Sequence, residues 1–228
     1  MTNRASQPAK EHANFAPVLN RIVGSFRKIY YRARESFGSH KRNIVVYRVE
    51  DARDSLEDAR TQFVSALDKF SSVVQFDGGS LEDKYTELRH ELDYSQLRAK
   101  AVSDRICAVE DVATTLFDEW QSELDQYSSR SLRRASRQQL KLTRQHYNRL
   151  MKAMHQAEAK IAPVLRAFKD QVLFLKHNLN AQAIASLHHE LKSIGMDIAA
   201  LIRTMEKSIF EANAFVNSLG DQKALPPA

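Results

Sequence analysis

The feature that most constrains the fold is a long stretch almost free of turn-forming residues. No glycine occurs between Gly79 and Gly195, and Pro163 is the only proline in that interval. Rossmann folds, barrels and sandwiches need frequent turns, which glycine and proline usually form. The 228 residues suffice for one domain with a sizeable core. Together these facts predict a few long helices.

Apolar residues recur mostly at alternating steps of four and three, the period of helices that pack along a coiled-coil seam. The first seam is Val45, Val49, Ala52, Leu56, Ala59, Phe63, Ala66, Phe70 and Val73. The second is Leu81, Tyr85, Leu88, Leu92, Ala99, Val102, Ile106, Val109, Leu116 and Trp120. The third is Leu140, Tyr147, Leu150, Met154, Ala157, Ile161, Val164, Phe168, Val172 and Leu175. The fourth is Ile184, Leu187, Leu191, Ile194, Ile198, Leu201, Met205, Ile209, Ala212, Val216 and Leu219.

Turn signals separate the four seams. Asp77-Gly78-Gly79 ends the first, and Ser80 follows as a helix N-cap. The next turn is Tyr127-Ser128-Ser129, where hydroxyl residues can cap the helix that follows, and Asn178-Leu179-Asn180 marks the last turn. Short connections make successive helices antiparallel. Pro163 lies within the third seam and predicts a kink rather than a break.

We therefore predict an all-α fold, an elongated antiparallel bundle of four long helices with coiled-coil-like packing, plus a short N-terminal amphipathic helix. Along the chain we expect a disordered polar arm over 1–14, the basic amphipathic helix over 15–36, the bundle over 40–219 and a disordered tail over 220–228. The hairpin over 119–141 is expected to overhang one end of the bundle.

Cysteine content and hydropathy indicate the compartment. A single cysteine, Cys107, excludes an intrachain disulfide and suits a reducing environment. It lies beside a core position, so we expect a buried, inert thiol. Residues 1–14 lack the apolar core of a signal peptide, and no stretch approaches the roughly 18–20 apolar residues of a membrane span. We expect a cytoplasmic protein that can lie peripherally on the inner membrane.

Charge is segregated along the chain. The net charge is +8 over residues 1–48, −11 over 49–127, +8 over 128–157 and +1 over 158–228. The third of these segments contains no acidic residue. A chain divided in this way has local surfaces that attract anions, although its total charge is only +6.

The first basic surface is the amphipathic segment near the N-terminus. It could lie in a membrane interface, with its apolar face in the headgroup boundary and its basic residues on anionic lipid. It could equally pack on the end of the bundle. The residues expected to insert or to bind anions are Arg21, Arg27, Lys28, Arg32, Arg34, Phe15, Leu19, Ile22 and Phe26.

The second basic surface opens the third helix. Arg130, Arg133, Arg134 and Arg137 suggest a contact with nucleic acid. The alternative is that acidic residues of the preceding helix pair with most of this run across the hairpin. Those acidic residues are Glu110, Asp111, Asp118, Glu119, Glu123 and Asp125.

No metal or catalytic site emerges from the pattern. Glu87 and His90 match the Glu-x-x-His unit of di-iron bundles, but a second copy is missing. His188 and His189 are adjacent, so they point about 100° apart on a helix. No two glycines have the spacing of a phosphate-binding loop. We predict no catalytic residue, no metal and no cofactor.

Several short segments together resemble a known family. They are Tyr30-Tyr31, Phe37-Gly38, His40-Lys41-Arg42, Arg48-Val49-Glu50-Asp51-Ala52-Arg53-Asp54, Phe76-Asp77-Gly78-Gly79, Leu81-Glu82-Asp83-Lys84-Tyr85 and Gln171-Val172-Leu173-Phe174-Leu175-Lys176-His177-Asn178-Leu179-Asn180. Over roughly residues 30–219 the chain resembles an uncharacterised proteobacterial helical family, domain of unknown function twenty-nine fifty-nine. The resemblance implies a helical bundle and little biochemistry. Many relatives look like lipoproteins, with a lipidated cysteine before the segment that matches Tyr30-Tyr31, and this chain lacks that cysteine.

Three functional hypotheses follow. The first is a non-catalytic structural or adaptor bundle that attaches to an anionic membrane surface through its basic residues. The second is a nucleic-acid-associated coiled coil, and the third is a self-assembling spacer whose remaining seams pair between chains. The partners expected are another protein, a second copy of the chain or anionic lipid.

Overall fold

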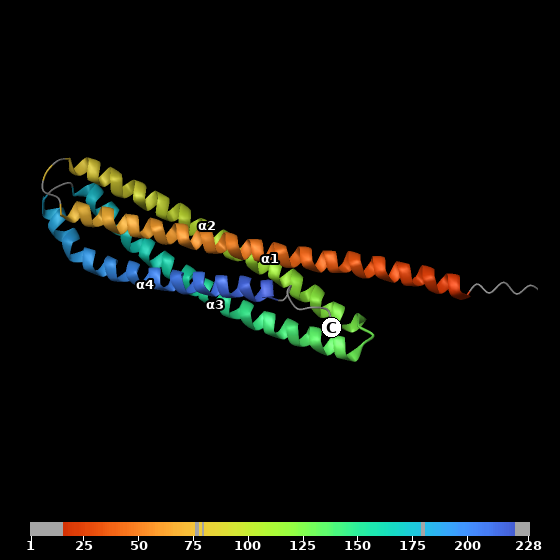
Figure 1. The fold of residues 1–228 in the computed structure, drawn as a ribbon. Coiled ribbons are helices and arrows are strands. Elements are labelled where there is room, and N and C mark those ends of the chain that lie inside the picture. Colours follow the sequence, from red (N-terminus) through yellow and green to blue (C-terminus); the bar gives the residue numbers. More distant parts are fainter. Residues whose placement is uncertain (1–15, 76–77, 79, 179–180, 222–228) are drawn as a thin grey trace, which may run out of the picture. The chain divides into compact units, whose positions relative to one another are not determined.

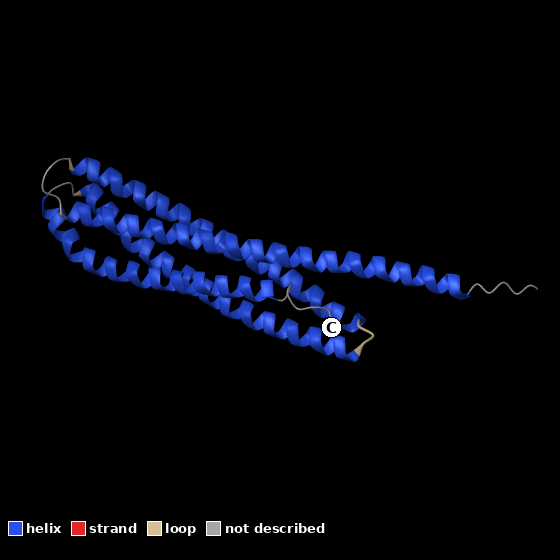
Figure 2. Ribbon diagram, in the orientation of Figure 1, coloured by secondary structure: helices blue, strands red, loops and turns tan. Residues whose placement is uncertain are grey.

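The computed structural model describes residues 16–75, 78, 80–178 and 181–221, with side chains described from Lys41 to Leu219 except at 76–77, 79 and 179–183. The elements are helices α1 (Ala16–Val74), α2 (Leu81–Glu123), α3 (Arg130–His177) and α4 (Ala181–Asp221), with a short 3₁₀ helix η1 (Leu124–Gln126) after α2 (Figures 1 and 2). Every regular element within these ranges is helical, which confirms the all-α fold.

Contacts divide the chain into two units, Met1–Lys41 and Arg42–Ala228. In the first unit the described residues, from Ala16 onward, belong to α1. The sequence predicts a separate short helix over 15–36, whereas the helical assignment continues through these residues into the first bundle helix. The nine residues predicted to bind lipid in this segment lie outside the described side chains, so their role stays a prediction.

In the second unit, α1 and α2 pack lengthwise in opposite directions. Arg105 Nη1 lies 3.5 Å from Asp51 Oδ2, and Arg98 Nη1 donates to Asp58 Oδ2 at 2.9 Å. Residue numbers therefore rise along α1 as they fall along α2. This is the antiparallel packing that the short connection predicts.

Helix α4 is likewise antiparallel to α1. Arg53 Nη1 donates to Asn213 Oδ1 at 3.1 Å, and Arg60 Nη1 lies 3.8 Å from Glu206 Oε1. From the first pair to the second, the residue number rises along α1 by as much as it falls along α4. The part of α1 from Arg42 onward is therefore held between α2 and α4.

The predicted turn chemistry is present at the starts of α2 and α3. Ser80 Oγ accepts a hydrogen bond from the Asp83 amide at 3.2 Å, and Ser129 Oγ accepts one from the Leu132 amide at 3.4 Å. Each serine satisfies one of the backbone donors left free at a helix start. Helix α3 continues through Pro163 without a break, and the kink expected there stays a prediction.

The core follows the predicted seams closely along α1 and α3. All nine residues of the first seam are at most 1% exposed. Phe70 of α1 meets Phe168 of α3 edge to face, with 6.3 Å between ring centroids. Apolar residues from all four helices join in one cluster, so these seams bury their side chains against one another.

The fourth seam is partly wrong near its end. The apolar spacing predicts Ile209 and Val216 as core residues, whereas Ser208 and Phe215 are the buried residues. The period of 3.5 that buries Met205 continues to 208 and 215, but the apolar neighbours at 209 and 216 drew the assignment one residue too far. Ser208 Oγ has no hydrogen-bond partner among the described atoms.

A second, smaller cluster fills the hairpin of α2 and α3. It contains Ala113, Phe117, Trp120, Leu124 and Leu140. The Trp120 indole donates to Ser136 Oγ at 2.9 Å, which fixes the level of one helix against the other. A core of its own makes this hairpin a rigid part of the second unit.

The hairpin extends past α4, as predicted. Phe215 of α4 lies 6.4 Å from Tyr147 of α3 between ring centroids, and the described part of α4 ends at Asp221. Six further residues of an antiparallel helix reach only to the level of about residue 141 of α3. The first turns of α3 therefore lie beyond the described end of α4.

Candidate functional site

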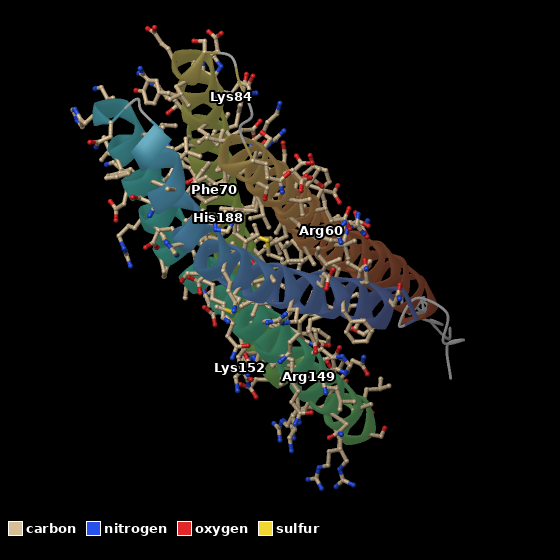
Figure 3. The ribbon with its side chains drawn as sticks, turned by 90° about the vertical axis from the view of Figure 1, so that its left-hand side faces the viewer. Arg60, Phe70, Lys84, Arg149, Lys152 and His188 are labelled. Atoms are coloured by element: carbon tan, nitrogen blue, oxygen red, sulfur yellow. The ribbon has the colours of Figure 1, made fainter. Side chains whose placement is uncertain are left out.

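Positive charge in the second unit is concentrated on one helix. Helix α3 has twelve Lys and Arg residues and two acidic residues, a net charge of +10. Helix α2, its partner in the hairpin, has a net charge of −6. Figure 3 shows Arg149 and Lys152 at the outer surface of α3, away from the interior that holds Phe70. The surface charge of α3 is therefore the most distinctive feature of the described residues.

None of these twelve basic side chains forms an ion pair with any residue that the structure describes. The contrast with the other helices is clear, since α1, α2 and α4 are joined by pairs such as Arg98 with Asp58 and Arg60 with Glu206. One expectation from the sequence is that acidic residues of the preceding helix neutralise most of the basic run across the hairpin. That expectation is wrong for the described residues of α3.

The Lys and Arg side chains of α3 lack acidic partners among the described residues of α2 because of the way α2 is rotated about its own axis. Its residues Glu110, Phe117 and Trp120 contact α3. Asp111 and Asp118 each follow one of these residues, so they point about 100° away from α3. The aspartates at 104, 111 and 118 of α2 recur every seven residues on that other face, and Asp125 of η1 follows at the same spacing; all four are exposed. A net acidic helix therefore turns a nearly acid-free side toward α3.

Arg144 is the basic residue of α3 that the fold itself uses. Its Nη2 donates to the Phe117 carbonyl oxygen at 3.3 Å, and its guanidinium lies 5.4 Å from the centre of the Phe117 ring. Arg42 plays a similar part from α1, with its guanidinium 4.8 Å from the centre of the Trp120 ring. Burial lowers the pKa of Arg42 from its ordinary value. Both cations stabilise the hairpin core.

The start of α3 carries basic residues where a helix favours acidic ones. Its first turn contains no acid, and Arg130 and Arg133 are two of its first four residues. The positive end of the helix dipole makes a cation there unfavourable by roughly 0.3–1 kcal/mol. The charges of these arginines therefore do not favour the start of the helix.

We call the exposed basic residues of α3 before its midpoint the cationic edge: Arg130, Arg134, Arg137, Lys141, Arg149 and Lys152. Three of the four predicted nucleic-acid contacts belong to it, and Arg133, the fourth, is half-buried. Sequence reasoning did not choose Lys141, Arg149 and Lys152, although the absence of acid over 128–157 was the signal that could have found them. Chemically, this edge can bind a surface or polymer of regularly spaced anions.

One histidine joins the two hairpin helices. His155 of α3 lies between carboxylates, with Nε2 2.8 Å from Glu110 Oε1 and Nδ1 3.1 Å from Glu158 Oε2. The hydrogen bond to Glu110 raises the pKa of His155, and Glu158 adds to the effect. With both ring nitrogens protonated, the imidazolium donates to both carboxylates.

This clamp predicts a pH-dependent stability. The pKa of His155 is higher in the folded state than its unfolded value of about 6.5. The clamp therefore stabilises fully below that value and is lost as the pH rises through the folded-state pKa. Urea unfolding at about pH 5.5 and pH 8.5 should show a larger free-energy gap between wild type and H155Q at the lower pH. The gap should be of the size of an exposed ion pair, about 0.2–1 kcal/mol. The E110Q variant should lose most of the same pH-dependent stabilisation. A gap that grows with pH would contradict the assignment.

Two other expectations concern reactive groups. Cys107 is a free, exposed thiol, so the predicted buried thiol is wrong, because residue 107 lies one step off the core position of Ile106. Burial between aromatic rings raises the pKa of Tyr147 to about 12. In the described residues, His, Cys, Asp and Glu form no group of three or more that could hold a metal ion.

No helix of the described residues is both long enough and apolar enough to span a membrane.

The comparison with known proteins concerns the same segment as the bundle. No curated protein matches the sequence. The model of a family described as protein of unknown function (DUF2959) matches residues 30–219, from within the predicted amphipathic segment over 15–36 to the last core residue of α4. This match covers most of the 228 residues, and the chain therefore belongs to the DUF2959 family.

Proposed function

We propose that this chain is a non-catalytic structural or adaptor bundle that attaches to an anionic membrane surface through the cationic edge of α3. The observation that supports the proposal is the charge of α3, +10 over one helix, with no ion pair from its Lys and Arg side chains to any described residue. A row of basic residues that the fold leaves unpaired has its charge available for an external anion.

The expected free energy of binding to an anionic bilayer is large enough for peripheral attachment. Each Lys or Arg near an anionic bilayer contributes about 1 kcal/mol, and the attraction falls off within a Debye length. Several residues of the edge acting together would give reversible peripheral binding. Anionic lipid is typical of the cytoplasmic leaflet, so we place the protein on the inner face of a membrane. The N-terminal segment over 15–36 is a second proposed contact.

Vesicle sedimentation tests the proposal. The full chain should bind vesicles of phosphatidylglycerol and phosphatidylcholine at low salt and should leave them as the salt concentration rises. It should bind much less to vesicles of phosphatidylcholine alone. Equal binding to both compositions, or binding to neither, would overturn the proposal.

A nucleic-acid partner is the second candidate, favoured by the same lack of ion pairs at Arg130, Arg133, Arg134 and Arg137. Phosphate contacts make such binding steeply dependent on salt. A gel-shift titration with duplex and single-stranded DNA at two salt concentrations separates the candidates. Retarded complexes without vesicle binding would favour nucleic acid over lipid.

A further inference from the structure

We infer that the turn between α2 and α3 enters the lipid headgroup layer end-on, with Tyr127 and Leu132 as its inserting side chains. This inference rests on the proposed function and specifies which part of the second unit meets the bilayer. It concerns residues 126–134, called the hairpin turn, which join the green ends of α2 and α3 in Figure 1.

Two apolar side chains are exposed at this turn. Leu132 is 57% exposed and Tyr127 is 39% exposed. Polar residues could fill these solvated positions, so their apolar character is notable. Tyrosine suits the boundary between headgroups and acyl chains, because its ring is apolar and its hydroxyl is polar. A leucine beside it supplies apolar area to bury in lipid.

Basic residues surround these two side chains. Arg130, Arg133 and Arg134 lie within the hairpin turn, and residues 126–134 include no acid. Asp125, just before the turn, is the nearest exposed acid and leaves the local charge clearly positive. Anionic headgroups fit this arrangement, whereas a nucleic acid would gain little from an exposed leucine.

The fold presents the turn rigidly. Ser129 caps α3, and its Oγ lies 2.9 Å from Ser131 Oγ. Behind the turn, Leu124 is fully buried in the hairpin cluster. The first turns of α3 also lie beyond the described end of α4. A short, capped turn on a packed hairpin can insert without first paying to become ordered.

Geometry distinguishes end-on insertion from contact along the side of α3. Leu132 and Lys141 are nine residues apart, so they point about 180° from each other around the helix. A flat bilayer along the cationic edge would leave Leu132 facing away, whereas a bilayer across the turn would reach both Leu132 and Arg130. The position of Leu132 therefore favours the end-on orientation.

The test compares two double variants by vesicle sedimentation with the full chain. Y127S/L132S should lower partition into phosphatidylglycerol-containing vesicles by about tenfold. L97S/F210S removes two apolar side chains that are also exposed, on α2 and α4, and should partition as wild type does. Circular dichroism of each variant would identify a folding defect.

A fluorescent label gives a second readout that needs no loss of binding. The chain has one cysteine, the exposed Cys107, about 20 residues and hence roughly 30 Å from the turn along α2. An environment-sensitive dye on C107S/L132C should shift to the blue with anionic vesicles, and the same dye on Cys107 should not.

The outcomes separate the inference from the proposed function. If the wild type binds anionic vesicles in a salt-dependent manner while Y127S/L132S binds equally well and the dye at 132 stays in water, the end-on inference is overturned and the proposed function stands. If the wild type binds no vesicles, both are overturned. The expected result is a blue shift of the dye at position 132 but not at Cys107, together with the loss of partition of about tenfold in Y127S/L132S.

Discussion

Replacing Phe70 by alanine should lower the free energy of unfolding by about 3–5 kcal/mol. Phe70 is fully buried in the main cluster, where it meets Phe168 edge to face. Figure 3 shows it in the interior of the second unit. Alanine would remove the buried apolar area and the ring contact, and it would leave a cavity that rigid helices close only in part. Urea unfolding followed by circular dichroism measures the change.

Phe210 provides the matched control. It is the same residue type on α4 but is 68% exposed, so F210A should change the free energy of unfolding by no more than about 0.5 kcal/mol. A loss below 1 kcal/mol for F70A, or equal losses for both variants, would mean that the helices do not pack around Phe70 as described.

The residues that were predicted correctly belong to elements where one physical rule dominates. The first seam from Val45 to Val73 repeats at 3.5 residues without interruption, and burial then follows from helix geometry alone. The caps at Ser80 and Ser129 follow from the hydrogen bonds that a helix start requires. Local chemistry suffices for both.

The prediction failed where the outcome depends on rotation about a helix axis. At 208 and 209 a polar and an apolar residue compete for one core position, and the register set by neighbouring helices decides for Ser208. Cys107 beside Ile106 was misplaced for the same reason, since one residue is 100° on a helix. Errors of one position therefore matter even when the helix itself is right.

The candidate site shows the same dependence on rotation. Composition alone revealed an acid-free run over 128–157 and an acidic helix before it. Whether those charges pair depends on the face that α2 turns toward α3, which the contacts of Phe117 and Trp120 determine. The aspartates at 111 and 118 sit one position beyond that face. The sequence therefore indicated the location of the site but could not establish that its charges stay unpaired.

Neutralising the four arginines at the start of α3 should weaken binding to anionic vesicles by about a thousandfold. The variant is R130Q/R133Q/R134Q/R137Q. Each arginine near an anionic surface contributes about 1 kcal/mol, and every 1.4 kcal/mol changes a binding constant tenfold. Partition coefficients from sedimentation at fixed ionic strength give the ratio to wild type. Glutamine keeps the length and helix propensity of these positions close to those of arginine.

The chain itself supplies a control with the same change in net charge. R149Q/K152Q/K160Q/R166Q removes four exposed basic residues from later turns of α3, and Arg149 is 12 residues beyond Arg137, roughly 18 Å along the helix. That separation exceeds the Debye length of about 8 Å at physiological salt. Arg149 and Lys152 belong to the cationic edge, but end-on docking relies on the part of the edge nearest the hairpin turn and therefore predicts a change of only a few fold for this variant. Equal losses in the two variants would show that α3 lies flat on the bilayer, so that charge along the whole helix, rather than the hairpin turn, determines the affinity.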